Sequence, residues 1–284
     1  MPEGDTVWRT AARLHAALAD QPITLVDLRW PRVSPHRLVG STTVGVVSVG
    51  KHLLHRFSDG WTLHSHLRME GRWAIAPAEP EVARALRRHD LRAAIGTAQC
   101  TAIGVRLGRL DLVTTSQEHT LVGHLGPDVL GPQWDHDETG RRLTAFDGFV
   151  VDALLDQRVL AGVGTYWASE ALFLERLLPW TRTSDVSADR LVALTSRLRQ
   201  LLTDAISPSS PTVGGRSGAR EAAWVHARSG RPCRRCGDLI RVALTGTAPR
   251  QRTIFSCATC QGGWAPTDNR RPQSPLGSGG GRRR

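Results

Sequence analysis

Two strand-like stretches decide the fold of the N-terminal half of the chain: Thr43-Val44-Gly45-Val46-Val47-Ser48-Val49 and Trp61-Thr62-Leu63-His64-Ser65-His66-Leu67. The second alternates between apolar and polar side chains, which is the period of a half-buried strand. Similar short segments, separated by Gly, Pro and Asp, continue from about residue 22 to 115. A β-sandwich or barrel is therefore expected. The stretch 76–88, rich in Ala, Pro, Glu and Arg, is expected to interrupt the sheet as a loop or short helix.

Helical patterns lie on both sides of this β region. At the N-terminus, apolar residues spaced along one face predict a helix over 5–19, with Asp5 as an available cap. Beyond Gly126, the stretch 148–178 predicts two helices around a break at 161–165, and an amphipathic helix capped by Ser187 follows it. Such a helix pair offers backbone amides that can bind phosphate, or it serves packing alone. Residues 207–218 are expected to form a loop.

The charge of the chain points to an extended anionic partner. Its 284 residues carry a formal net charge of +11 and a pI near 11.0, and 40% apolar residues are enough to bury the cores of about two domains. Nucleic acid is the first candidate, although charge alone does not distinguish DNA from RNA or from a membrane. The sequence has no run of 18 apolar residues and no signal peptide. We therefore expect a cytoplasmic protein with no membrane partner.

Four of the five cysteines form two C-x2-C pairs with 20 residues between them: Cys233, Cys236, Cys257 and Cys260. This spacing is typical of a four-thiolate zinc site, whose closed coordination sphere holds a hairpin and does not activate water. Two disulfides or a redox C-x2-C motif are the alternatives, and they need an oxidising compartment or a thioredoxin-like setting. We predict one structural Zn²⁺, and we expect the isolated Cys100 to be a buried residue outside the site.

Residues near the N-terminus predict covalent chemistry. Removal of Met1 would leave Pro2 as a terminal secondary amine, which can attack a sugar aldehyde carbon and form an iminium. Its neighbour Glu3 could act as a general acid on the sugar ring oxygen. Among 37 Lys and Arg residues only Lys51 is a lysine, which indicates a role for its proton or compact head that a guanidinium cannot fill. The alternatives are a proline that only starts a helix and a lysine kept by chance.

Several separated motifs resemble the Fpg/Nei DNA glycosylases, the family of formamidopyrimidine-DNA glycosylase and endonuclease VIII. They cover about residues 1–265 in the family's order: Met1-Pro2-Glu3-Gly4, Gly50-Lys51-His52-Leu53-Leu54, Ser65-His66-Leu67-Arg68-Met69-Glu70-Gly71, Leu125-Gly126-Pro127-Asp128-Val129-Leu130, Leu154-Leu155-Asp156-Gln157, Gly162-Val163-Gly164 with Glu170, and the cysteine hairpin.

The resemblance implies an α+β fold in four parts. An N-terminal helix and β-sandwich would form the catalytic domain (1–125), followed by a helix-two-turn-helix DNA-binding domain (126–222), a zinc-finger β-hairpin (223–265) and a disordered basic tail (266–284). It further implies a monomer that binds damaged DNA, duplex or single-stranded, in the nucleoid. Such enzymes flip a damaged base out of the helix, form a Schiff base at C1′, and cleave the strand by β- and δ-elimination.

The resemblance implies a role for each catalytic residue that matches the family. Pro2 would be the Schiff-base nucleophile and Glu3 the proton donor in base release. Lys51 would contact phosphate and transfer a proton in β-elimination, and Arg252, five residues before Cys257, would serve the δ step.

The resemblance also implies a set of DNA contacts. Met69 would fill the space left by the flipped base, although a lone methionine is more often a core residue. The other implied contacts are Arg68, His89, Arg109, His124 and Thr165.

The sequence departs from the family pattern at three places. Asp5 and Thr6 follow Gly4, so a second acid near the amine is missing or is replaced by Asp5. Thr165 stands where asparagine is typical, which weakens one expected phosphate contact. Residues 108–111 lack the Arg-Phe pair of formamidopyrimidine-type enzymes.

The missing Arg-Phe pair, the Pro-Glu-Gly start and the Gly-Pro-Asp-Val-Leu motif favour the endonuclease VIII side of the family. Oxidised pyrimidines are then the first substrate class, and 8-oxoguanine or formamidopyrimidine is the second. A non-catalytic member that only binds damaged DNA is a further alternative. A zinc ribbon of RNA metabolism would leave the N-terminal motif unexplained.

Overall fold

The computed structural model of the chain describes residues 2–31, 38–77, 81–207, 223–271 and 273. Its contacts divide the chain into two compact units, Met1–Leu125 and Gly126–Arg284. The predicted loop after Ser207 and the predicted domain boundary at 222 lie outside the described residues. Within the described residues, no helix has the length and apolar character that crossing a bilayer requires.

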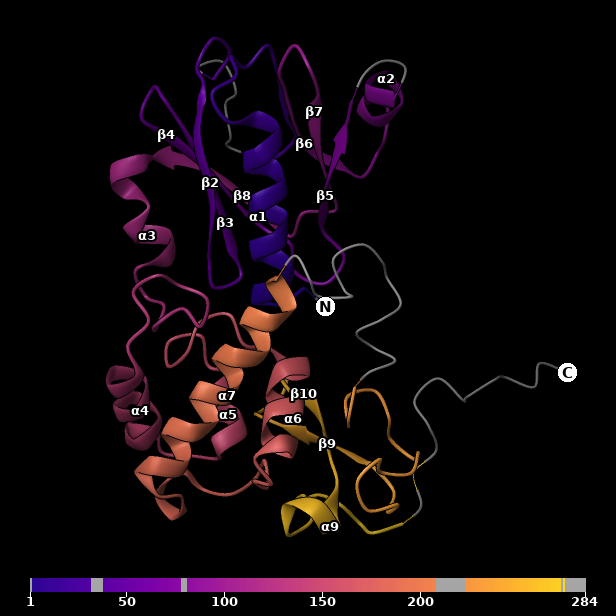
Figure 1. The fold of residues 1–284 in the computed structure, drawn as a ribbon. Helices are drawn as coiled ribbons and strands as arrows, with labels where there is room; N and C mark the ends of the chain where they lie inside the picture. The colour runs from indigo at the N-terminus through magenta and orange to yellow at the C-terminus, as the bar shows by residue number, and fades with distance from the viewer. Residues whose placement is uncertain (1, 32–37, 78–80, 208–222, 272, 274–284) are drawn as a thin grey trace, which may run out of the picture. The chain divides into compact units, whose positions relative to one another are not determined.

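The first unit is a sandwich of two antiparallel sheets with a helix packed against it (Figure 1). Its elements are α1 (Gly4–Leu18), β1 (Leu25–Leu28), β2 (Thr43–Val49), β3 (His52–Phe57), β4 (Trp61–His66), β5 (Arg72–Ala76), α2 (Glu81–Leu86), β6 (Leu91–Gly96), β7 (Thr101–Val105), β8 (Arg109–Thr114), a 3-10 turn (Thr115–Gln117) and α3 (His119–Val122). The strand orders are β1-β6-β7-β5 and β2-β3-β4-β8. The predicted sandwich, N-terminal helix and short helix within 76–88 are confirmed.

The core of this unit lies between the two sheets, with α1 contributing one helical face. Both sheets and the helix share a single buried cluster, which includes Val7, Ala11, Leu14, Leu18, Val46, Leu53, Phe57, Leu63, Trp73, Ala93, Ile95, Ala102 and Leu110. Burying a leucine or valine of this kind contributes about 1.5–3 kcal/mol. The spacing of the apolar residues in α1 therefore determines which face of the helix packs on the sandwich.

The second unit joins a helical part to a β-hairpin (Figure 1). Its elements are α4 (His136–Ala145), α5 (Val150–Leu155), α6 (Thr165–Leu174), a 3-10 turn (Thr183–Asp185), α7 (Ala188–Ile206), β9 (Arg241–Thr245), β10 (Arg252–Ser256) and α9 (Ala258–Gln261). Ser187 occupies the N-cap position of α7, as predicted, but its side chain makes no capping hydrogen bond. The helices enclose a cluster in which Leu154, Leu172 and Leu198 are fully buried.

Three local predictions need correction. Glu3, not Asp5, is the N-cap residue of α1, because the helix begins at Gly4; Asp5 lies in its first turn and accepts a hydrogen bond from Arg9 at 2.6 Å. The break between α5 and α6 begins at Asp156, before the expected position, because the Asp156 carboxylate accepts from the backbone N–H of Arg158 at 2.9 Å and forms a local turn.

The predicted disordered tail is wrong for its first residues. Asp268 forms an ion pair with Arg241 of β9, with Oδ1 at 2.6 Å from Nη2, and both side chains are buried. Farther along, the Gln273 side chain bonds both backbone polar groups of Val242. A buried charge needs a buried partner, so this pair ties the chain after the hairpin to β9.

Candidate active site and metal centre

The predicted nucleophile and acid flank the start of α1. Glu3 is 3% exposed, and its backbone carbonyl accepts the first helical hydrogen bond, from Val7 N–H at 3.0 Å. Pro2 precedes it and is partly exposed. The helix N-terminus places positive potential beside both groups, which disfavours a protonated amine at Pro2. The local arrangement therefore combines an accessible proline with a sequestered carboxyl group.

Lys51 lies in the tight turn between β2 and β3. The strands pair through Val49 and His52, so Gly50 and Lys51 form a two-residue hairpin loop. Gly50 has a φ of 57°, in the left-handed region that such turns require and that glycine adopts without strain. The turn places Lys51 at the end of the second sheet, partly exposed.

Arg68 and Met69 lie in the turn that follows β4. Met69 is 65% exposed, which excludes the core role that a lone methionine usually has. Arg68 has a φ of 51°, and its backbone N–H donates to Nδ1 of His66 at 2.9 Å. A Cβ on Gly108 would lie 2.4 Å from Cγ of Arg68, so glycine is required there for the arginine stem to pack. The turn thus presents a flexible apolar side chain to solvent.

If Met69 fills the space left by a flipped base, as the resemblance implies, replacing it by alanine is expected to lower excision of a damaged base about tenfold, which corresponds to about 1.4 kcal/mol. The melting temperature should not change, since the side chain is exposed. Single-turnover base release and thermal unfolding, measured on the same preparation, test this. A loss of stability without a loss of excision would mean that Met69 packs within the protein.

Four histidines gather at this end of the second sheet. The ring of His52 stacks on His64 at a centroid distance of 5.0 Å, and it meets His66 edge-on at 5.1 Å and His124 at 6.2 Å. Burial lowers the pKa of His52 to about 3, with repulsion from the other three histidines and Arg109 adding to it.

The ring of His66 is held neutral as well. Burial, followed by repulsion from His64, Arg68, Lys51 and Arg109, lowers the pKa of His66 to about 4. Lys51, Arg68, Arg109 and His124 each act electrostatically on His52 or His66. These four residues therefore lie in one electropositive region at this end of the sheet. His89 is exposed in the turn before β6 and belongs to no such contact set among the described residues.

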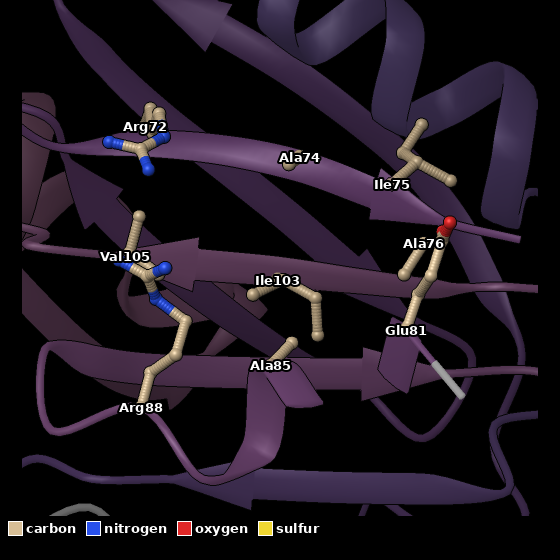
Figure 2. Close-up of a pocket in the computed structure, with 9 residues that line it drawn as sticks. All are labelled: Arg72, Ala74, Ile75, Ala76, Glu81, Ala85, Arg88, Ile103 and Val105. Carbon is tan, nitrogen blue, oxygen red and sulfur yellow. The ribbon is translucent and has the colours of Figure 1, made fainter. Parts of the chain in front are cut away.

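A pocket on the other sheet lies apart from these residues. Its apolar floor comes from Ala74, Ile103 and Val105, while Arg72 and Arg88 approach one end and Glu81 the other (Figure 2). Arg88 is paired with Asp90 at 2.8 Å. None of the predicted site residues lines this pocket, so it is not part of the candidate active site.

In the second unit, Gln157 braces the turn that leads into α6. Its Nε2 donates to the carbonyl of Val163 at 3.0 Å, and its Oε1 accepts from the N–H of Gly162 at 3.1 Å. Thr165 is the first residue of α6 and is partly buried. A Cβ on Gly126 would lie 2.5 Å from the carbonyl oxygen of Val159, so this glycine lets the segment after Leu125 lie against the turn. The turn is therefore rigidly built.

The four paired cysteines converge to one point. All four Sγ atoms lie within 4.8 Å of one another; Cys233 and Cys260 are 3.9 Å apart, and Cys236 and Cys257 are 3.5 Å apart. Tetrahedral Zn–S bonds of about 2.3 Å place sulfurs about 3.8 Å apart, so the set fits that ion. No disulfide links the cysteines. The cluster can hold one metal ion.

Arg252 begins β10 and is exposed, five residues before Cys257 of the cysteine cluster. It pairs with Thr245 across the hairpin.

Two sets of stabilising contacts in this region were not predicted from the sequence. The buried carboxylate of Glu170 on α6 accepts from the backbone N–H groups of Trp224, Val225 and His226 at 2.8–3.0 Å. Arg235, between two cysteines, lies 4.2 Å above the ring of Phe173. The sequence contained Glu170 within a motif but gave no signal of its partners, which lie more than fifty residues away.

Comparisons with known proteins agree with this arrangement. Residues 1–110 match the model for the formamidopyrimidine-DNA glycosylase N-terminal domain, and residues 125–215 match the model for its H2TH domain. A protein of Streptomyces coelicolor named "Probable endonuclease 8 2" is 44% identical, over 94% of this chain and 96% of that protein. A Mycolicibacterium smegmatis protein named "DNA-(apurinic or apyrimidinic site) lyase Nei2" is 38% identical, over 92% and 99%.

A solved structure has the same fold at lower identity. Fpg of Lactococcus lactis, in complex with DNA that contains N7-benzyl-Fapy-dG, superposes with a TM-score of 0.76 at 23% identity, covering 92% of this chain and 99% of that chain. The Escherichia coli protein named "Endonuclease 8" is 30% identical over 92% of this chain and its whole length. The chain therefore belongs to the Fpg/Nei family of DNA glycosylases and is similar to its endonuclease VIII members.

Proposed function

We propose that the protein is a bifunctional DNA glycosylase and AP lyase of base excision repair that acts on oxidised bases, with pyrimidines preferred. One observation carries the proposal: Pro2 directly precedes Glu3, whose carboxyl group is sequestered at the start of α1, in a chain of the Fpg/Nei family. A protein that only binds DNA needs neither a terminal secondary amine nor an adjacent acid. The names of the endonuclease 8 and AP lyase relatives support the same activity.

The proposed reaction begins at C1′ of the damaged nucleotide. The Pro2 nitrogen donates its electron pair to C1′ while the glycosidic bond breaks, and the base leaves with that bond's electrons. Glu3 supplies a proton for base release. The proton lost from the Pro2 nitrogen passes to the ring oxygen O4′ as the C1′–O4′ bond breaks, which gives an iminium between Pro2 and C1′ and a hydroxyl group at C4′.

Strand cleavage follows from the iminium. Loss of the C2′ proton forms a C2′=C3′ double bond, and the 3′ phosphate leaves with the electrons of the C3′–O bond. We assign the proton transfer to Lys51. Loss of the C4′ proton then forms a C4′=C5′ double bond, and the 5′ phosphate leaves with the electrons of the C5′–O bond, so that a one-nucleotide gap remains. Water adds to C1′ of the iminium, and cleavage of the C1′–N bond returns the amine.

The metal in the cysteine cluster is proposed to be one Zn²⁺ with a structural role. Four protein thiolates would fill a tetrahedral sphere and leave no position for water or substrate. The bound ion would fix the hairpin that carries Arg252.

Replacing Arg252 by alanine is expected to stall the reaction after β-elimination. The guanidinium would stabilise the second departing phosphate, and losing such a contact costs about 2–4 kcal/mol, or roughly 30- to 1000-fold in rate. A denaturing gel that separates the unsaturated-aldehyde product from the 3′-phosphate product measures both steps. A normal yield of 3′-phosphate ends would remove Arg252 from the δ step.

The substrate preference is tested with duplexes that differ in one base. We expect faster single-turnover cleavage of an oligonucleotide carrying one oxidised pyrimidine than of a matched one carrying 8-oxoguanine. A duplex that already contains an abasic site reports the lyase step alone. Binding of all three without cleavage would show a DNA-binding protein that lacks the chemistry.

A further inference from the structure

A chain of hydrogen bonds crosses the second sheet from β3 to β8. Nδ1 of His52 lies 2.8 Å from Nε2 of His64, and Nδ1 of His64 lies 2.8 Å from Oδ2 of Asp111. The same Asp111 oxygen accepts from Nε of Arg109 at 2.8 Å. Strand register explains the juxtaposition, because His64 pairs with Asp111 and His66 pairs with both His52 and Arg109. These side chains therefore share one face of the sheet.

The order of donors and acceptors follows from Asp111. An ionised carboxylate only accepts, so Nδ1 of His64 carries a proton. Burial lowers the pKa of His64, with the hydrogen bond to Asp111 opposing it, so the ring is neutral and its Nε2 is an acceptor. Nδ1 of His52 must then donate, which leaves the lone pair of this neutral ring on Nε2.

Arg109 is the other ligand of the Asp111 carboxylate. Its side chain is 50% exposed, and among the described residues Nε is the only one of its side-chain nitrogens with a hydrogen bond. The two Nη groups, which are donors only, remain for a ligand. An arginine held at Nε loses less rotamer freedom when its Nη groups bind phosphate.

We propose that Asp111 is a positioning residue for the DNA-binding side of this sheet: it orients the guanidinium of Arg109 and, through His64, fixes the tautomer of His52, which directly follows Lys51. The inference rests on the proposed function for its ligand, the phosphate backbone of DNA. It adds three residues, Asp111, His64 and His52, which support the DNA contact Arg109 and the hairpin turn of Lys51.

A double-mutant cycle tests the hydrogen bond between Asp111 and Arg109. The dissociation constant for a duplex with a tetrahydrofuran abasic analogue is measured for the native protein, Asp111→Ala, Arg109→Ala and the double variant. We expect Asp111→Ala to weaken binding about tenfold in the native background and to have little further effect once Arg109 is absent. An equal loss in both backgrounds would mean that Asp111 supports the fold alone, which overturns the proposal.

Two companion variants guard against a folding defect. Asp111→Asn keeps an oxygen acceptor, so it should restore part of the lost affinity; an Asn variant as weak as the Ala variant argues against an orienting role. Asp27→Ala is the matched control, because Asp27 also bonds Nε of an arginine, Arg29, and has a similar side-chain exposure of 32% against 28% for Asp111. It should bind DNA like the native protein.

The hydrogen-bonded connection from Asp111 through His64 to His52 can be tested without DNA. ¹⁵N chemical shifts of labelled histidine at neutral pH should show His64 and His52 protonated on Nδ1, and Asp111→Ala should abolish this preference at both rings. If His52 of the native protein is protonated on Nε2, Asp111 does not fix its tautomer through His64, and this part of the proposal is refuted. If the native protein fails to bind the duplex at all, the proposed function fails, while the tautomers still decide whether Asp111 acts on His52 through His64.

Discussion

Replacing Pro2 by leucine is expected to abolish covalent capture of abasic DNA, lowering the trapping rate about a thousandfold or more, as loss of a nucleophile does in other enzymes. A leucine at the second position is too large for Met1 to be removed, so the terminal amine moves one residue away from Glu3 and C1′. DNA binding should persist, because the basic surface of the protein is unchanged.

The matched control is Pro2→Ala, which keeps a small second residue. Met1 should still be removed, and a primary amine then occupies the place of the proline nitrogen. We expect weak but measurable capture of a preformed abasic site by this variant. Intact-mass measurement establishes the N-terminus of each protein. Undiminished capture by Pro2→Leu would show that Lys51 or another amine is the nucleophile.

Replacing Cys257 by serine is expected to release the metal and unfold the hairpin. Structural zinc contributes roughly 10 kcal/mol to the folding of small zinc domains at neutral pH. Cys257 is fully buried and directly follows β10, so the loss of this ligand also removes support from Arg252. The metal content should fall from about one ion per chain to none, with loss of strand cleavage.

Cys100→Ser is the control for this experiment. Cys100 stands outside the cluster, as expected, but the prediction that it is buried is wrong: it is partly exposed, and its thiol donates to the carbonyl of Ala17. Metal content, measured by mass spectrometry of the elements, and strand cleavage should both be unchanged. A Cys257→Ser protein that lacks zinc but cleaves DNA at the native rate would contradict the structural role of the ion.

Acid should release the same metal. Thiolates bind zinc and thiols do not, so affinity falls as pH falls and the cysteines become protonated.

The helices and strands could be predicted because they depend on local sequence patterns. The strand over 43–49, the helix ending at Leu18 and the helix capped by Ser187 each have the period or the cap of the observed element. The converging cysteines follow from C-x2-C spacing, which is also local. The exposed position of Met69 could not be predicted in this way, since a methionine at that position is compatible with a core.

The supporting residues of the site depend on register between distant strands. The contact between His64 and Asp111 joins residues 47 positions apart, and nothing in either stretch specifies which residue of β8 faces which residue of β4. Glu170 and the Asp268–Arg241 pair escaped prediction for the same reason. Local chemistry thus indicated the proposed reacting groups, whereas the hydrogen bonds around them became visible only in the fold.

Borohydride trapping with peptide mapping tests directly whether the N-terminal proline is the nucleophile. The native protein is incubated with an oligonucleotide carrying one oxidised pyrimidine, the imine is reduced, and the adducted peptide is located by mass spectrometry. If Pro2 is the nucleophile, a single adduct on the N-terminal proline is expected. An adduct on Lys51, or DNA that is bound but never trapped, would contradict it.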